Sequence, residues 1–306
     1  MAVLLITATA IGCSAKPDRA ALSDATSTTA RQAVPTTTTV IPGATFAAGV
    51  RQFRSDEVAK VMHVELENLT AAPIRVGSVQ LSWAGLAEVA PSAPDYTTHP
   101  GVVVALEMDY GAGRCPAAGE PPTSTRGAVV RVTGTAADGS AVSTDVAVTR
   151  YAETLERIQK VQCDNQAVAD VVDVALVGPW TETTTADGRP AATGRVAVSP
   201  VGDLDERVVL VSIVGAGVLV DLETLPPGRT PMADLAPGDG PVEVPVAVVG
   251  SARCDGHALG EDKKTYDMYA TVEVDGTQHY ADLAFALDDR PTVWRVVTRT
   301  CGVATG

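Results

Sequence analysis

Aromatic side chains are scarce in this sequence: Phe, Trp and Tyr make up only 4% of its 306 residues. Hydrophobic residues still reach 45%, so any core must consist mainly of valine, alanine and leucine. Valine is β-branched and favours strands, and the 27 glycines and 20 prolines suffice to separate short strands by turns. A chain of this length has room for two ordinary domains. We therefore expect an all-β protein.

Positive charge is also in short supply. The chain has 23 Lys and Arg residues against 37 Asp and Glu residues, which gives a formal net charge of −14. A surface with this balance repels phosphate backbones and anionic lipid headgroups. We therefore expect no nucleic-acid partner and no direct attraction to an anionic membrane surface.

No apolar run in the chain is long enough to span a bilayer. The longest candidate at the start is residues 2–12, within MAVLLITATAIGC. Eleven apolar residues are too few for a transmembrane helix but suit the hydrophobic region of a signal peptide. The run Val208–Val220 contains Ser212, Gly215 and Gly217, which predicts a strand, a turn and a second strand.

The end of the leader resembles the cleavage motif of bacterial lipoproteins. The residues that carry this resemblance are Ala10, Ile11, Gly12 and Cys13, and it covers only the leader. It implies a signal peptide over residues 1–13 and a mature chain that begins at Cys13, whose sulfur carries a lipid. The protein would then be anchored to the outer face of the cytoplasmic membrane, or secreted if no lipid is attached.

Residues 14–42 are rich in Ser, Thr, Ala and Pro and contain almost no large apolar side chains. Such a segment cannot bury enough surface to fold. We expect a disordered stalk between the leader and the folded part.

The remaining chain contains an internal repeat of about 138 residues. Gly113-Arg114-Cys115 corresponds to Ala252-Arg253-Cys254, and an Asp-Gly pair follows each motif. Asp-Gly between strand-like runs is a strong hairpin signal. Seven or so short strands per repeat fit an immunoglobulin-like β-sandwich, as an architecture and not as a family. We therefore expect two tandem sandwich domains, over residues 43–165 and 166–306.

Four cysteines remain after the leader: Cys115, Cys163, Cys254 and Cys301. In an exported chain an even number of cysteines indicates disulfides. Four cysteines allow three pairings, and the repeat selects the one in which Cys115 bonds Cys163 and Cys254 bonds Cys301.

One segment conflicts with the repeat. Tyr151, Leu155, Ile158 and Val161 have helical spacing, whereas the corresponding Val293–Thr300 has the composition of a strand. Because both repeats should share one fold, we expect strands in both places.

Catalytic signatures are missing from the sequence. It contains no nucleophile elbow, no zincin helix and no phosphate-binding glycine loop, and only four histidines. We therefore expect a protein without enzymatic activity and without a cofactor.

The most site-like stretch surrounds His257. Cys254 and His257 have the spacing of zinc ligands, and Asp255 and Glu261 lie nearby. A disulfide at Cys254 would remove one ligand, so we expect no metal site and keep an envelope enzyme or metal carrier near His257 as the alternative.

Two further alternatives concern carbohydrate and spacing. Trp83, Trp180 and Trp294 could form a platform that stacks on sugars, although three tryptophans more often serve in packing. Asn68-Leu69-Thr70 matches a glycosylation sequon but is expected to mark a turn. The leading hypothesis is a non-catalytic binding or adaptor module at the cell envelope, whose partner is an unknown envelope protein or cell-wall component. A pure spacer is the third possibility.

Overall fold

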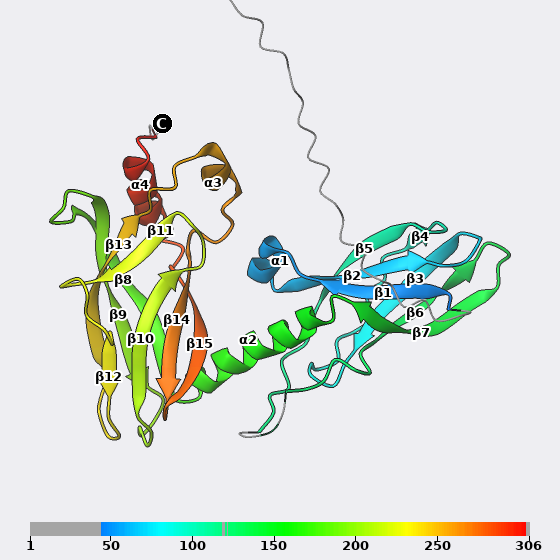
Figure 1. Cartoon of the computed structure of the whole chain (residues 1–306), viewed down its shortest axis with the longest axis horizontal. Coiled ribbons are helices and arrows are strands. Elements are labelled where there is room, and N and C mark those ends of the chain that lie inside the picture. The colour runs from blue at the N-terminus through cyan, green and yellow to red at the C-terminus, as the bar shows by residue number, and fades with distance from the viewer. Residues whose placement is uncertain (1–43, 118–119, 121, 304–306) are drawn as a thin grey trace, which may run out of the picture. The chain divides into compact units, whose positions relative to one another are not determined.

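The strands follow the alternation of apolar and polar residues in the sequence. In β14 (Asp267–Val274) every second residue is buried, from Met268 to Val274. This period of two places one row of side chains in a core and the other row at the surface. The computed structural model describes residues 44–117, 120 and 122–303 (Figure 1). The leader, Cys13 and the stalk over residues 14–42 lie outside the described residues.

Before the helix at its end, the described part of the first repeat contains one short helix and seven strands that form a single seven-stranded sheet in the order β4-β3-β6-β7-β1-β2-β5. β1 and β7 are parallel and join the two halves of this sheet. The elements are β1 (Phe46–Arg51), α1 (Arg54–Ala59), β2 (Val61–Asn68), β3 (Ile74–Ser82), β4 (Tyr96–Thr98), β5 (Val103–Asp109), β6 (Val129–Ala136) and β7 (Ala141–Arg150).

The second repeat contains two four-stranded sheets, with the orders β12-β10-β14-β15 and β11-β13-β9-β8. This is the strand arrangement of an immunoglobulin-like sandwich. Its elements are β8 (Val172–Thr184), β9 (Pro190–Pro200), β10 (Val208–Gly215), β11 (Val220–Thr224), β12 (Ala233–Leu235), β13 (Val242–Gly250), α3 (Gly256–Glu261), β14, β15 (Thr277–Ala284) and α4 (Arg290–Thr300).

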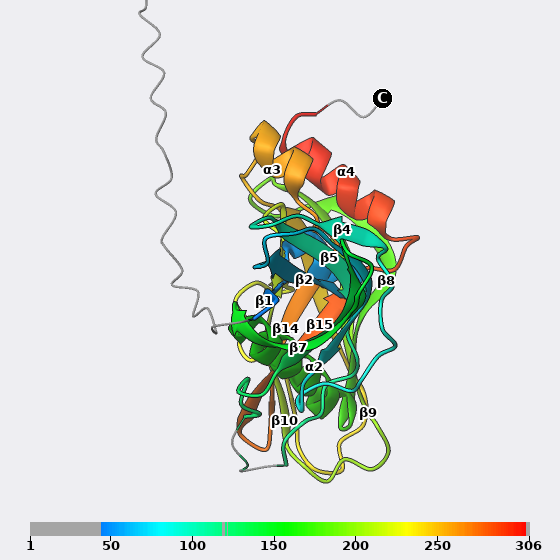
Figure 2. The ribbon, with the colours of Figure 1, turned by 90° about the vertical axis from the view of Figure 1, so that its right-hand side faces the viewer.

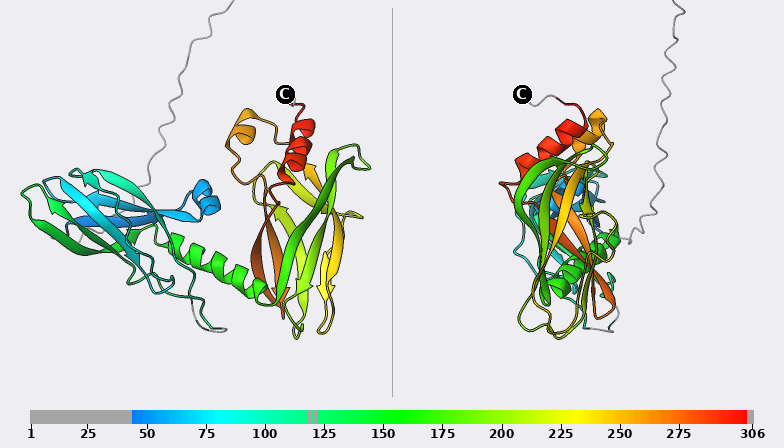
Figure 3. Two further views of the ribbon diagram at one scale, coloured as in Figure 1. Left: turned by 180° about the vertical axis from the view of Figure 1, so that it is seen from behind. Right: turned by 90° about the vertical axis from the view of Figure 1, so that its left-hand side faces the viewer.

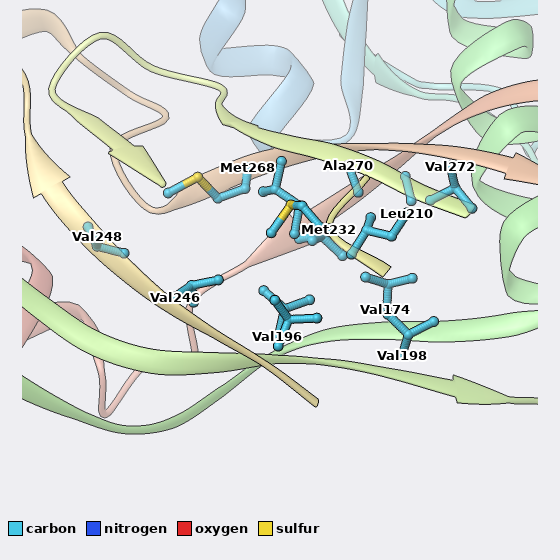
Figure 4. Close-up of a cluster of buried hydrophobic side chains, with 14 of the residues drawn as sticks. Val174, Val196, Val198, Leu210, Met232, Val246, Val248, Met268, Ala270 and Val272 are labelled. Atoms are coloured by element: carbon cyan, nitrogen blue, oxygen red, sulfur yellow. The ribbon is translucent and has the colours of Figure 1, made fainter. Parts of the chain in front are cut away.

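Each repeat has its own hydrophobic core, made mainly of aliphatic side chains. In the first, Val64 and Leu66 of one half of the sheet pack with Val130 and Val132 of the other. In the second, side chains from both sheets meet, among them Val196, Leu210, Val246 and Met268 (Figure 4). The expected all-β fold with two β-sandwiches is confirmed.

The Asp-Gly turns are where the sequence places them. Asp138-Gly139 joins β6 to β7, and Asp275-Gly276 joins β14 to β15. Asp275 and Gly276 both have positive φ, 47° and 76°. A two-residue hairpin loop of type I′ requires positive φ at both positions, and Asp-Gly meets that requirement at low cost.

The prediction of strands at residues 151–161 and 293–300 is wrong. Both segments are helices: α2 (Glu153–Ala169) follows β7, and α4 follows β15. In α4 the buried apolar side chains are Val293, Val296 and Val297, which is helical spacing. Burial of this face outweighs the weak helix propensity of valine. The repeat is therefore real, but the element that it shares is a helix.

α2 is one unbroken helix of 17 residues (Figure 3). Leu155 and Ile158 belong to the first core, and Val168 belongs to the second. The domain boundary that the sequence suggested, between residues 165 and 166, therefore falls inside a helix instead of in a short linker.

Each helix that ends a repeat carries or adjoins a cysteine. Cys115 bonds Cys163 of α2, and Cys254 bonds Cys301, which directly follows α4. These are the two disulfides that the repeat predicts. Closing chain segments of 48 and 47 residues stabilises each fold by about 4 kcal/mol in the chain-entropy account. The second disulfide joins a residue just before α3 to the residue just after α4, and Figure 2 shows these two helices close together.

Candidate functional site

The strand β5 lies at one margin of its sheet and is paired on one side only (Figures 1 and 2). Its seven residues run antiparallel to β2, with Val103 opposite Glu67 and Asp109 opposite Val61. Among the described residues, no further hydrogen bond involves β5. In an antiparallel ladder the N–H and C=O groups of successive residues point to opposite sides. The outward half of these groups on β5 is therefore open to another strand.

The second repeat covers the corresponding strand. β13 is the counterpart of β5 in the second repeat, because each of the two strands is the last strand before the first cysteine of its repeat's disulfide. β11 pairs antiparallel with β13 along Val246–Gly250. The ladder continues one step past β11, where the N–H of Leu225 donates to the carbonyl of Pro245 at 2.9 Å, and Pro245 itself has no N–H to offer to another strand. Neither protection is found on β5, whose sequence is VVALEMD.

The first repeat has only a remnant of that covering strand. The N–H of Ala87 donates to the carbonyl of Ala112 at 2.8 Å, and Leu86 forms a bridge with Gly113. Both contacts lie beyond the last residue of β5. The space beside β5 is therefore the position of a strand that one repeat has and the other lacks.

The other sheet margins are short or closed. β4 and β12 have three residues each, and β11 at the margin of the other sheet has five. β8 contains Pro179 and an irregular register between Val177 and Thr181. On β15 the N–H of Asp282 donates to the side-chain oxygen of Asn165 at 2.7 Å. Such devices limit unwanted strand pairing in natural sheets, and β5 is the long margin without one in the part of the chain that the structure describes.

The side chains of β5 divide between two faces. Val104 and Met108 are buried in the first core. Val103, Glu107 and Asp109 are exposed on the opposite face. A strand added beside β5 would meet an apolar row on one face and an acidic row on the other.

Four polar side chains of β1, β2 and α1 near this outer face are already paired with one another. Arg51 Nε lies 3.1 Å from Glu65 Oε1, and His63 Nδ1 lies 3.0 Å from Asp56 Oδ2. Within the described residues, Glu107 and Asp109 have neither an ion pair nor a hydrogen bond of their side chains. Both carboxylates are therefore available to a partner.

A buried ion pair lies across β1 on this face. Arg150 of β7 is 9% exposed, and its Nη1 donates to Glu67 Oε2 at 3.1 Å. Its Nε and Nη2 are buried and have no hydrogen-bond partner. The guanidinium finds room because Gly49 has no side chain: a Cβ there would lie 2.9 Å from the Cβ of Arg150.

The structure uses the sequence-suggested metal residues in other ways. His257 is exposed, and its Nδ1 lies 3.2 Å from Glu261 Oε1 one helical turn away. Asp255 is the N-cap of α3 and accepts a hydrogen bond from the N–H of Ala258, which holds the pKa of this carboxyl below its usual value. Cys254 is in a disulfide. Across the described ranges, no group of three or more His, Cys, Asp or Glu side chains is placed to hold a metal ion.

The tryptophans do not form a shared platform. Trp83 is 5% exposed in the first core, and Trp180 is 6% exposed in the second. Trp294 packs against the second core. Trp83 also donates its indole N–H to the carbonyl of Ser124 at 2.9 Å. A hollow of about 10 Å³ beside Trp83 has room for about one water molecule.

Asn68 is fully buried and serves the fold. Its amide donates to the carbonyls of Ala72 and Thr98, at 2.9 and 3.3 Å. Its side-chain oxygen accepts hydrogen bonds from the N–H and the hydroxyl of Thr70, at 2.9 and 2.7 Å. The sequon thus forms the turn after β2, as expected, and its amide is not available to a glycan.

No protein-family model and no curated protein matches the chain. Among solved structures, similarity was found to the CsuC–CsuE chaperone–tip adhesion subunit complex of Acinetobacter baumannii archaic Csu pili, at 10% identity over 73% of this chain and 91% of that one, with a TM-score of 0.15. Red sea bream transglutaminase matches at 10% identity over 79% of this chain and 31% of its own, with a TM-score of 0.20. The BSP domain of a biofilm-associated protein matches at 8% identity, over 79% and 59%, also with a TM-score of 0.20.

Proposed function

We propose that this protein is a non-catalytic binding module of the bacterial cell envelope, and that it takes up an extended segment of a protein partner at the open edge of β5. The observation that carries the proposal is the unpaired outer side of β5, beside which the second repeat has a strand and the first has none. Adding a strand to an open sheet edge is an established mode of peptide recognition, in which main-chain hydrogen bonds supply affinity and alternate side chains supply specificity.

The compartment is proposed on two grounds. Two disulfides persist where the surroundings are oxidising, as they are outside the cytoplasm. The lipoprotein-like leader implies a lipid on Cys13 and attachment to the outer face of the membrane. Of the helices that the structure describes, none has the length and apolar character needed to cross a bilayer.

The rival functions have less support from the geometry. A metal carrier near His257 would need ligands that converge, and Asp255 and Cys254 are committed to a helix cap and a disulfide. A sugar platform would need exposed tryptophans, and Trp83 and Trp180 are buried. A spacer needs no binding edge, so the same experiment distinguishes it from a binding module.

The experiment places a photo-cross-linking amino acid at Ala105 of β5, in the full chain in cells that make it. Ala147 is the matched control, because it is an exposed alanine on β7, which has strands on both sides. We expect Ala105, and not Ala147, to give a cross-link that maps to one extended segment of a partner. A synthetic copy of that segment should then protect the amides of β5 from hydrogen exchange. Equal cross-linking at both positions, or none at Ala105, would contradict the proposal and favour the spacer.

A further inference from the structure

We infer that the segment bound at β5 is a strand of another protein that alternates apolar and basic residues and runs antiparallel to β5. This inference rests on the proposed function and adds the chemistry and direction of the partner. It follows from the two faces of β5, the charges on them and the arrangement of the covering strand in the second repeat.

The direction follows from the repeat. β11 runs antiparallel to β13, the counterpart of β5. A strand added in the same position and sense would have its amino end beside Asp109 and its carboxyl end beside Val103. All other neighbouring strands of the first sheet are also antiparallel, except β1 and β7.

The apolar positions follow from the core-facing row. Val104 and Met108 are 8% and 6% exposed, and Leu106 between them is partly buried. They are the last side chains of the first core on this margin. Directly opposed residues of neighbouring strands contact one another on the same face. Every second residue of the bound strand would therefore extend the core and should be apolar.

The basic positions follow from the outer row. Glu107 and Asp109 are exposed, two residues apart on one face, and carry no ion pair within the described residues. Opposite charges across a strand pair are favourable, and like charges are unfavourable. Lysine or arginine at the alternate positions of the bound strand would meet both carboxylates.

A second copy of this chain fits the edge poorly. Each copy would bring another Glu107 and Asp109 to the same short interface, and each chain carries a formal charge of −14. Bringing two such surfaces together is opposed by their repulsion. The charge thus favours a basic partner over self-association.

The test uses three synthetic peptides of about nine residues, enough to cover a strand of this length. In one, Lys and Val alternate; in the second, Thr replaces Lys; in the third, Glu replaces Lys. We expect the Lys–Val peptide to bind the full chain most tightly and the Glu–Val peptide most weakly. The double variant Glu107→Lys/Asp109→Lys should bind the Lys–Val peptide about tenfold or more weakly and bind the Glu–Val peptide more tightly.

The matched control is Asp203→Lys/Asp205→Lys. These two aspartates are exposed, have the same spacing and have no ion pair or hydrogen bond of their side chains in the structure's described ranges, so the change in net charge is identical. Binding of the Lys–Val peptide should stay close to that of the unmodified chain. An equal loss in both double variants would show general attraction to an acidic protein and would overturn the inference.

The remaining outcomes separate this inference from the proposed function. If all three peptides bind equally well and protect β5, the open edge is a binding site but its preference for basic strands is wrong. If none binds, the proposed function itself fails. If the chain dimerises through β5 in the absence of peptide, the strand that occupies this edge belongs to a second copy of the chain and not to a basic partner, and the inference is wrong.

A spin label on the peptide tests the direction. A label at the amino end should broaden the amide signals near Asp109, and a label at the carboxyl end those near Val103. The reverse pattern would show parallel pairing and overturn the antiparallel assignment.

Discussion

The side-chain oxygen of Asn165 accepts a hydrogen bond from the backbone N–H of Asp282 at 2.7 Å. Asn165 belongs to α2, and Asp282 belongs to the marginal strand β15. The bond occupies a donor that another strand would otherwise use. The chain thus closes β15 at this position with a side chain and leaves β5 open, and this contrast supports β5 as the proposed binding edge.

Replacing Asn165 by Ala should open β15 locally. The amide of Asp282 should exchange its hydrogen faster, because its acceptor is gone, and the free energy of unfolding should fall by about 1 kcal/mol. Hydrogen exchange measured by NMR checks the first effect and urea unfolding the second. Exchange along β5 serves as the control and should not change. An unaltered exchange rate at Asp282 would show that the side chain does not close this edge.

Asn68→Ala should destabilise the first sandwich strongly. The substitution removes four hydrogen bonds at a fully buried position and leaves the carbonyl of Thr98 in a buried site without this donor. We expect a loss of about 2–4 kcal/mol. Urea unfolding of the full chain measures it. A loss below about 0.5 kcal/mol, the lower end for a single bond, would contradict the assigned role.

The two outer-face ion pairs should differ in their contribution. Removing the carboxylate in Glu67→Ala leaves Arg150 buried and without its partner, which should cost about 3 kcal/mol. Removing it in Glu65→Ala leaves Arg51, which is 37% exposed and can be hydrated, so the loss should be about 1 kcal/mol or less. Chemical unfolding of both variants tests this order. Equal losses would mean that the burial of Arg150 does not determine how much its ion pair contributes to the free energy of unfolding.

The cap of α3 should show a dependence on pH. The hydrogen bond from the N–H of Ala258 lowers the pKa of Asp255 in the folded protein. A lowered folded pKa contributes stability above the unfolded pKa, and that contribution is lost as the pH falls through the folded value. Asp255→Ala should therefore lower the melting temperature at pH 7 more than in acid. His257→Ala is the control, and a pH-independent difference for Asp255→Ala would contradict this account.

The sequence alone was sufficient for the elements that depend on short-range patterns. The alternation in β14 and the Asp-Gly turns follow from local chemistry, whereas the cysteine pairing follows from the internal repeat, and the structure agrees with each. The helices α2 and α4 were missed because the strand-like composition of Val293–Thr300 was carried over through the repeat to residues 151–161, against the helical spacing of Leu155 and Ile158. The spacing was the better signal, since it records which face is buried.

The candidate site was not found from the sequence. VVALEMD is an ordinary strand sequence, and nothing in it shows that the neighbouring strand is missing. That fact depends on which strands pair, which is decided by contacts far apart in the chain. The internal repeat held a usable signal: the segment between β3 and β5 is shorter than the segment between β10 and β13, and it lacks a counterpart of β11.

Hydrogen exchange along β5 tests the binding edge most directly. In the free protein, alternate amides of Val103–Asp109 should exchange fast and the others slowly, because only one side of the strand is paired. Saturation with the Lys–Val peptide should slow the fast set and leave the slow set unchanged. Uniform protection along β5 in the free protein, or no slowing with any strand-forming peptide that binds, would contradict the open edge.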